Sequence, residues 1–166
     1  MSRATRRQEL KRVDLVRRAT DADADCLGRV MYDAIHKGRS AYTAAQKRAW
    51  LAAPPAGPAW AARLASQTLW LAEGANGPTA FISLGPQGYV DLAFVAAASQ
   101  GRGVFRALCA ALETYAVQKG CSRLWTHASL MAQPAFEACG FRVIRHETVL
   151  RAQPTLARAE MEKFLR

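Results

Sequence analysis

The residues with the clearest chemical potential lie in a short glycine-containing turn, Gln100-Gly101-Arg102-Gly103-Val104-Phe105. An apolar run of strand length, Tyr89 to Ala96, precedes it, and an amphipathic run from Val104 to Lys119 follows it. At such a strand-to-helix junction several main-chain amides lack a helical acceptor, and the positive end of the helix dipole lies behind them. Because glycine lets a ligand approach the backbone closely, the turn predicts a phosphate or pyrophosphate site. The spacing alone leaves a ligand-free turn open as the alternative.

Polar residues on two predicted strands form a second candidate group. Strict alternation places Tyr89 and Asp91 on one face of the strand 89–96, and His127 and Ser129 on one face of a strand over residues 121–129. A carboxylate between apolar neighbours needs either a charged partner or a proton. Asp91 is therefore a candidate general base. The alternative is a structural ion pair between Asp91 and Arg17 or Arg18.

The remaining chain predicts alternating strands and helices that position these residues. A capping box at Thr20 and Asp23 indicates a helix that ends near Gly38, and Thr43 can cap the next helix. A short helix is expected from Pro58, and another over residues 133–139. Further strands are expected over residues 13–19, 68–73, 79–84 and 141–149. For residues 155–165 the composition favours a helix, although the spacing of the apolar residues also suits a strand.

Composition excludes several classes of protein. The chain has 166 residues, of which 51% are hydrophobic, and we expect a mobile basic tail over residues 1–12 and a single domain over residues 13–166. No segment is apolar enough to span a membrane. The 4 cysteines lie far apart, which predicts no metal site, reduced thiols and a cytoplasmic protein. The net charge of +10 comes from scattered residues, so we expect attraction of a polyanionic ligand rather than nucleic-acid binding.

The turn is neither a P-loop nor a dinucleotide loop, but it resembles the pyrophosphate loop of the GNAT N-acetyltransferases, Gln/Arg-x-x-Gly-x-Gly/Ala. Gln100 and Gly103 match that pattern, and Phe105 departs from it at the last position. A later segment resembles another motif of the family through His127-Ala128-Ser129, Ala132, Pro134, Phe136-Glu137 and Gly140-Phe141. The front half resembles a bacterial branch of the family through residues 17–23, Tyr42-Thr43 and Trp50.

The resemblance implies an α/β fold. Its sheet is mixed and mostly antiparallel, with a central splay between two parallel strands and helices on both faces. It also favours a final strand over residues 155–165, which we adopt. The pantetheine arm of acetyl-CoA would lie in the splay and pair with the backbone of Phe94 and Val95. The pyrophosphate would contact Gln100, Gly101, Arg102, Gly103, Val104, Phe105 and Arg106.

The activity that the resemblance implies is direct transfer of acetyl from acetyl-CoA to a primary amine of a small molecule in a ternary complex. Asp91 and Tyr89 fall where family members place residues that deprotonate the amine. The tyrosine that protonates the leaving thiolate in the family falls on Phe136, which carries no proton to donate. Ser129, His127, the nearby Cys139 and solvent are the remaining donors, although a strand histidine such as His127 is also a common structural residue.

The missing tyrosine motivates a second hypothesis, in which the chain is a non-catalytic acyl-CoA binding or sensing domain. Net charge alone motivates a nucleic-acid binder, which a salt-dependent interaction with DNA would have to support. We expect the acceptor to be selected by the segment from Tyr32 to Trp60. The sequence leaves both a monomer and a homodimer open.

Overall fold

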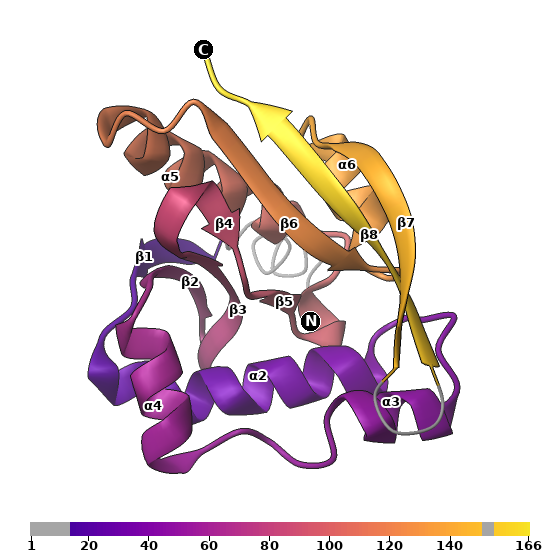
Figure 1. The fold of residues 1–166 in the computed structure, drawn as a ribbon. Helices are drawn as coiled ribbons and strands as arrows, with labels where there is room; N and C mark the ends of the chain where they lie inside the picture. Colours follow the sequence, from indigo (N-terminus) through magenta and orange to yellow (C-terminus); the bar gives the residue numbers. More distant parts are fainter. Residues whose placement is uncertain (1–13, 151–154) are drawn as a thin grey trace, which may run out of the picture.

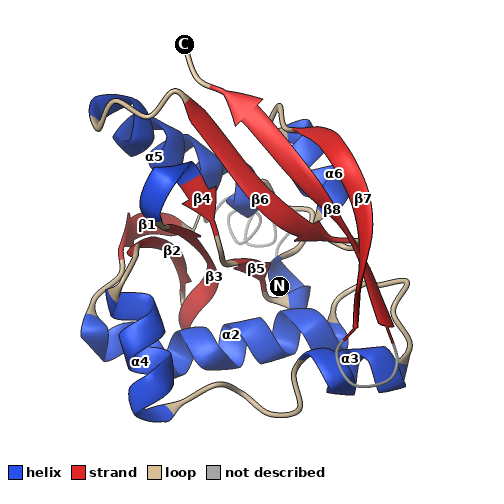
Figure 2. Ribbon diagram, viewed as in Figure 1, coloured by secondary structure: helices blue, strands red, loops and turns tan. Residues whose placement is uncertain are grey.

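The computed structural model describes residues 14–150 and 155–166 of the chain (Figures 1 and 2). The longer helices are α2 (Ala24–Lys37), α3 (Ala44–Trp50), α4 (Gly57–Ala65), α5 (Val104–Gln118) and α6 (Gln133–Ala138). The strands are β1 (Leu15–Arg18), β2 (Thr68–Gly74), β3 (Gly77–Leu84), β4 (Tyr89–Val90), β5 (Ala93–Val95), β6 (Arg123–Ser129), β7 (Arg142–Leu150) and β8 (Thr155–Phe164). The predicted basic tail over residues 1–12 lies outside the described residues.

In the described part of the chain the strands form two sheets of four, in the orders β1-β2-β3-β5 and β4-β6-β8-β7. Only β4 and β6 run parallel, with Tyr89 opposite Trp125, and the other neighbouring strands are antiparallel. The two sheets diverge between β5 and β6 (Figure 1). The expected mixed, mostly antiparallel α/β fold with a central splay is therefore confirmed.

The splay arises because the segment 89–96 changes sheets. The sequence predicted one strand here, which was wrong, since β4 and β5 are separated by Asp91 and Leu92. On one side of the break, the hydroxyl of Thr126 donates to the carbonyl of Val90 at 2.8 Å and holds β4 against β6. On the other side, the amide of Leu92 donates to the Ser83 hydroxyl at 2.9 Å, so β5 continues along β3. Polar side chains of the neighbouring strands thus satisfy the backbone at the break.

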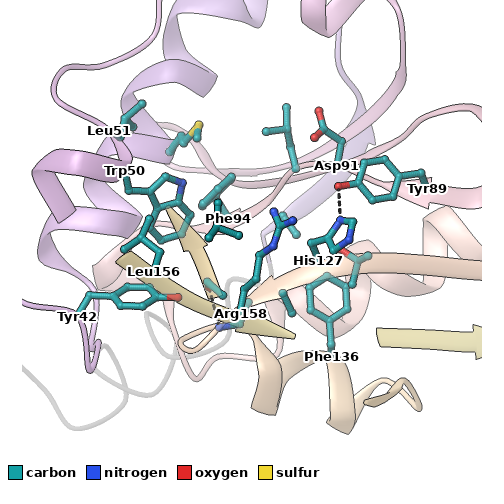
Figure 3. Close-up of a pocket in the computed structure, with 18 of the residues that line it drawn as sticks. Tyr42, Trp50, Leu51, Tyr89, Asp91, Phe94, His127, Phe136, Leu156 and Arg158 are labelled. Carbon is teal, nitrogen blue, oxygen red and sulfur yellow. Dashed lines mark hydrogen bonds between the residues drawn. The ribbon is translucent and has the colours of Figure 1, made fainter. Parts of the chain in front are cut away.

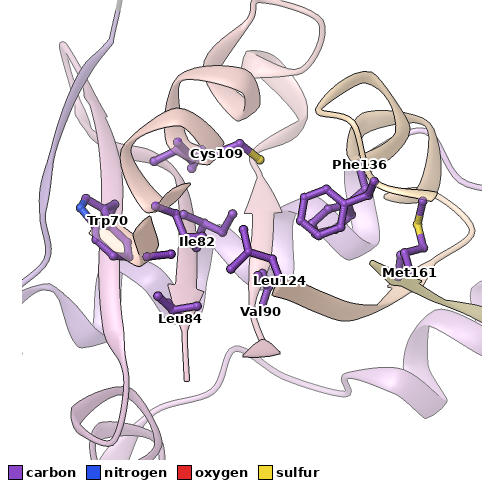
Figure 4. Close-up of a cluster of buried hydrophobic side chains, with 14 of the residues drawn as sticks. Trp70, Ile82, Leu84, Val90, Cys109, Leu124, Phe136 and Met161 are labelled. Carbon is purple, nitrogen blue, oxygen red and sulfur yellow. The ribbon is translucent and has the colours of Figure 1, made fainter. Parts of the chain in front are cut away.

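Helices cover both faces of the first sheet. The apolar side of α2, which includes Leu27 and Ile35, packs with α4 against one face through Leu71 and Phe81. The opposite face packs against α5, whose Leu108 and Leu112 are buried at 0% and 1% exposure. This second cluster extends into the other sheet through Val90, Leu124 and Met161, and to α6 through Phe136 (Figure 4). Burial of these apolar side chains supplies the main stabilising free energy at the junction of the sheets.

Several local predictions are confirmed. The Asp23 carboxylate accepts from the Thr20 amide at 2.8 Å at the start of the first helical segment, and Thr43 caps α3 by accepting from the Gln46 amide at 3.1 Å. Residues 155–164 form a strand, although their composition favours a helix, because β8 pairs with both β6 and β7. Tertiary pairing overrides local propensity here. Among the described residues, no helix is both long and apolar enough to cross a membrane.

Candidate active site

Two adjoining cavities among the described residues occupy the splay between the sheets. The first has a volume of about 280 Å³ and lies on the side of α3, α4 and the β7–β8 hairpin. The second has a volume of about 420 Å³ and lies between β5, the start of α5 and α6. Both are lined by Ala93, Phe94, Ser129 and Ala132. A molecule in one cavity would therefore meet a molecule in the other at this junction.

The second cavity contains most of the predicted ligand-binding turn. It is lined by Phe94, Val95, Gln100, Gly101, Gly103, Val104, Phe105 and Arg106. Arg102 is exposed and is not part of the lining. The amide of Ala107 donates to the Gly103 carbonyl at 3.2 Å, so the amides that precede Ala107 at the helix start lack a helical acceptor. They face an open cavity at the positive end of the α5 dipole, which is the arrangement that binds anions.

The two glycines of the turn have a conformation that other residues rarely adopt. Gly101 and Gly103 have φ angles of +73° and +80°, and a Cβ added to either would meet no protein atom within 4 Å. The missing side chains therefore leave space next to the backbone. That space and the positive φ angles together account for glycine at both positions.

The open edge of β5 is available to a ligand beside this turn. Leu92 accepts from the Ser83 amide, and the Ala96 amide donates to Thr79, each at 2.8 Å. Because main-chain groups alternate along a strand, those of Ala93 and Val95 point away from β3 and toward the splay. The main-chain groups of Phe94, which the sequence named, point toward β3 instead. The Val95 carbonyl already accepts from the side-chain amide of Gln100 at 3.1 Å, so Gln100 holds the turn against the end of β5.

The four predicted catalytic candidates all line the first cavity: Tyr89, Asp91, His127 and Ser129. Figure 3 shows the first three. The parallel pairing of β4 with β6 brings the first three together, since Tyr89 lies opposite Trp125, two residues before His127. The Tyr89 hydroxyl is 3.0 Å from Nδ1 of His127. Nε2 of His127 lies 3.5 Å from a carboxylate oxygen of Glu147. These contacts favour the tautomer with a proton on Nε2, in which Nδ1 accepts from Tyr89.

Burial shifts the pKa values of Tyr89 and His127 in opposite directions. Desolvation, followed by the nearby charge of Arg158, lowers the pKa of His127 below its ordinary value of 6.5. Desolvation, followed by the negative charge of Asp91, raises the pKa of Tyr89 above 10.0. Near neutral pH the site therefore holds a neutral imidazole beside a neutral phenol.

Asp91 is held by partners that differ from those the sequence suggested. Arg63 of α4 binds both carboxylate oxygens, at 2.9 and 3.0 Å, and Gln67 donates at 2.8 Å. The expected alternative partners are wrong: Arg17 pairs with Asp23 and Glu73, and Arg18 stacks on Trp70 and Tyr115. Asp91 still lines the cavity, so its negative charge is oriented there by Arg63.

Ser129 and Phe136 lie close to the junction of the cavities. The Ser129 hydroxyl accepts from the Ala132 amide at 3.2 Å, and it lines both cavities. Phe136 is 2% exposed and packs edge-on against Phe105 and Phe141, with ring centroids at 5.1 and 5.0 Å. Two phenylalanines depart from the motifs of the family, Phe105 in the loop and Phe136 in the helix. They pack against each other.

Several cavity residues were missed by sequence reasoning. The segment 32–60, which we expect to select the acceptor, contributes Tyr42, Trp50 and Leu51 to the lining of the first cavity. Arg63 comes from beyond that segment, and Arg158 comes from β8, far along the chain. In the sequence, Arg158 is a charged residue that alternation along the strand places on the same face as Leu156. It becomes informative only once β8 is known to lie beside β6.

These features define a mixed α/β protein with paired cavities at a splay in its sheets and a glycine-containing helix start at one end. Residues 39–157 match the family described as an acetyltransferase (GNAT) domain. The chain belongs to the GNAT acetyltransferase family.

Solved structures agree with this assignment. A GCN5-related N-acetyltransferase from Rhodopseudomonas palustris is 27% identical with a TM-score of 0.82, over 92% of this chain and 96% of that chain. A phosphinothricin acetyltransferase from Sinorhizobium meliloti, in complex with acetyl-CoA, is 16% identical with a TM-score of 0.72, over 92% and 89%. A ribosomal-protein-alanine N-acetyltransferase from Brucella melitensis is 20% identical with a TM-score of 0.65, over 91% and 99%. The names of the last two proteins differ in the acceptor, so the shared fold does not determine it. A comparison with curated proteins gave no match.

Proposed function

We propose that the protein is an acetyl-CoA-dependent N-acetyltransferase that acts on a primary amine of a small molecule. The observation that carries this proposal is the junction of the two cavities at Ala93, Phe94, Ser129 and Ala132. The second cavity has the features of a site for an anion and a pantetheine arm, and the first cavity is lined by the polar candidate side chains. A thioester that reaches the junction from the second cavity would be close to an amine in the first cavity, as direct transfer in a ternary complex requires.

The residues of the second cavity fit acetyl-CoA. Gly101 and Gly103 leave room for phosphate oxygens next to unpaired amides, and the exposed Arg106 adds positive charge at the rim. The main-chain groups of Ala93 and the amide of Val95, which point away from β3, match an arm that carries amide groups. The net charge of +10 favours the approach of a polyanion. Bound acetyl-CoA supplies the thioester: the amine forms a bond to its carbonyl carbon, the C–S bond breaks, and coenzyme A leaves as the thiol.

The chain's own residues would handle the two protons of this reaction. Asp91, oriented by Arg63, attracts the amine and can accept its proton directly or through a water molecule. The Tyr89–His127 pair offers a second acceptor, since its imidazole is neutral near pH 7. The leaving sulfur takes a proton from solvent or from Ser129, whose hydroxyl lies at the junction. Phe136 provides no proton and instead packs the junction against Phe105.

Because Phe136 carries no proton to donate, a non-catalytic acyl-CoA binding or sensing domain is the second candidate function. Thiol release from acetyl-CoA in the presence of a panel of small amines separates the two functions. We expect amine-dependent release of coenzyme A together with an acetylated amine identified by mass spectrometry. Tight binding of acetyl-CoA by calorimetry, with no release for any amine, would favour the sensing domain. Absence of binding would refute both.

A further inference from the structure

The first cavity contains an arginine that the proposed proton transfers do not use. Arg158 of β8 is the cross-strand neighbour of Ser129 on one side and of Glu147 on the other. Its Nε donates to Glu147 at 2.7 Å. Figure 3 shows its guanidinium directed into the cavity, between Phe94 and His127. Within residues 14–150 and 155–166, neither of its terminal nitrogens donates a hydrogen bond to the protein.

Among the described residues that line the cavity, Arg158 is a cation whose terminal nitrogens have no hydrogen-bond partner. Arg63 donates to both carboxylate oxygens of Asp91, through Nε and one terminal nitrogen. His127 is neutral near pH 7 because burial lowers its pKa. Arg158 is anchored through Nε alone, and its side chain is 32% exposed. A guanidinium with two free N–H directions in a partly buried site is suited to a planar carboxylate, which it can bind with two parallel hydrogen bonds.

The wall next to Arg158 is apolar. Trp50 lies edge-on to Tyr42 and 6.0 Å from Phe94, measured between ring centroids. Leu51, Leu156, Met31 and Val149 complete this side of the cavity. Asp91 and Tyr89 lie on the opposite side (Figure 3). The cavity therefore offers a cation, an anion and an apolar wall within a volume of about 280 Å³.

We propose that the acceptor is an α-amino acid with an apolar side chain, whose carboxylate is bound by Arg158. The side chain would pack against Trp50 and Leu156, and the amine would lie toward Asp91 and the junction of the cavities. An amine and a carboxylate on one carbon match the two opposite charges that line a single small cavity. This inference rests on the proposed acetyl transfer and specifies the class of acceptor.

A matched series of acceptors tests the inference. L-Leucine, L-leucinamide and 3-methylbutylamine share a side chain and an amine, and differ in whether they carry a carboxylate, a neutral amide or neither. Thiol release from acetyl-CoA gives kcat/KM for each, corrected for the fraction of free amine at each pH. We expect leucine to be preferred over both analogues by about 10- to 100-fold, the range expected for hydrogen bonds to a charged group. L-Glutamate, which places a second charge against the apolar wall, should be poor.

Variants of two arginines show whether Arg158 is responsible. Arg158→Gln should reduce the leucine-to-leucinamide ratio of kcat/KM by about 10- to 100-fold, mainly through KM for leucine. Arg158→Lys keeps the charge but loses the paired N–H donors of the planar guanidinium, so it should retain an intermediate preference for leucine over leucinamide. Arg145→Gln is the control, since Arg145 also contacts Glu147 but is 63% exposed and lies outside the cavity lining. It should keep the wild-type ratio.

The outcomes that overturn the inference differ from those that overturn the proposed function. Equal or better use of 3-methylbutylamine, or a leucine preference that survives in Arg158→Gln, would refute the carboxylate site. Failure of every carboxylate-bearing acceptor to react would refute it too, whether or not another amine is acetylated. Acetyl-CoA binding measured by calorimetry in the same samples tests the proposed function separately, because it does not depend on the acceptor.

Discussion

The hydroxyl oxygen of Tyr89 lies 3.0 Å from Nδ1 of His127, and this contact joins the two parallel strands at the point where the sheets separate. The two residues are 38 positions apart in the chain. Their pairing depends on the parallel register of β4 and β6. The contact places a neutral proton acceptor and a neutral proton donor at the wall of the first cavity.

The first prediction concerns the pH dependence of stability through His127. Its pKa is lower in the folded protein than the ordinary 6.5, so the unfolded chain binds a proton first as the pH falls. The free energy of unfolding should therefore decrease as the pH drops below 6.5 toward the folded-state pKa, and His127→Gln should flatten this part of the curve. Urea unfolding at several pH values measures this free energy of unfolding. His146→Gln removes an exposed histidine of β7 and is the comparison; equal effects of both variants would contradict the assignment.

The second prediction concerns Asp91. Asp91→Asn keeps the shape but removes the negative charge, and it should lower kcat by ~10²–10⁴ with little change in acetyl-CoA affinity, as for one positioned base. Asp25→Asn, at an exposed position of α2, is the control and should have wild-type kcat.

Arg63→Met tests whether Asp91 does more than pair with Arg63. It breaks the same ion pair but leaves the carboxylate in the cavity, held by Gln67. We expect a smaller loss of kcat than for Asp91→Asn. Equal losses of kcat and of unfolding free energy in both variants would mean that the ion pair is structural.

The third prediction concerns the turn at the start of α5. Gly103→Val places a β-branched side chain at a φ of +80° and in the space that we propose for phosphate. It should abolish acetyl-CoA binding in calorimetry while the protein remains folded by circular dichroism. Gly120→Val is the matched control, because Gly120 has a φ of +78°, is equally free of neighbours within 4 Å and lies at the other end of the helix.

Both glycine variants should lose stability, by roughly 1–2 kcal/mol or more for the left-handed backbone conformation. Only Gly103→Val should lose binding. Unchanged affinity in Gly103→Val would show that the turn has no ligand, and equal loss in both variants would point to general unfolding.

The fourth prediction concerns the core beneath the site. Leu108→Ala and Leu112→Ala remove buried side chains of α5 and should each cost about 2–5 kcal/mol of unfolding free energy. Val117→Ala, on the same helix but 48% exposed, should cost less than about 0.5 kcal/mol. Denaturant midpoints at constant m-value measure all three. Similar small costs at all three positions would mean that α5 does not pack as described.

Local patterns were sufficient for most of the fold. The helix boundaries followed from caps such as Thr43 and from glycine and proline positions, since these act within a few residues of the chain. The glycine turn was identified for the same reason, because its amides and its two glycines are consecutive. The alternation in the segment 89–96 agrees with the burial of Val90 and Phe94 between less buried neighbours.

What the tertiary structure decided is where distant segments meet. Alternation put Asp91 on the cavity face, but only the tertiary fold brought Arg63 of α4 to it as a partner. The break at Asp91 and Leu92 depends on hydroxyl groups of β3 and β6, so the segment's own apolar pattern could not reveal it. Arg158 entered the site through the pairing of β8 with β6 and β7, against the helical propensity of its own segment. Caps and turns are determined by neighbours in sequence, whereas ion pairs and cavity walls are determined by contacts between strands and helices that the chain brings together only on folding.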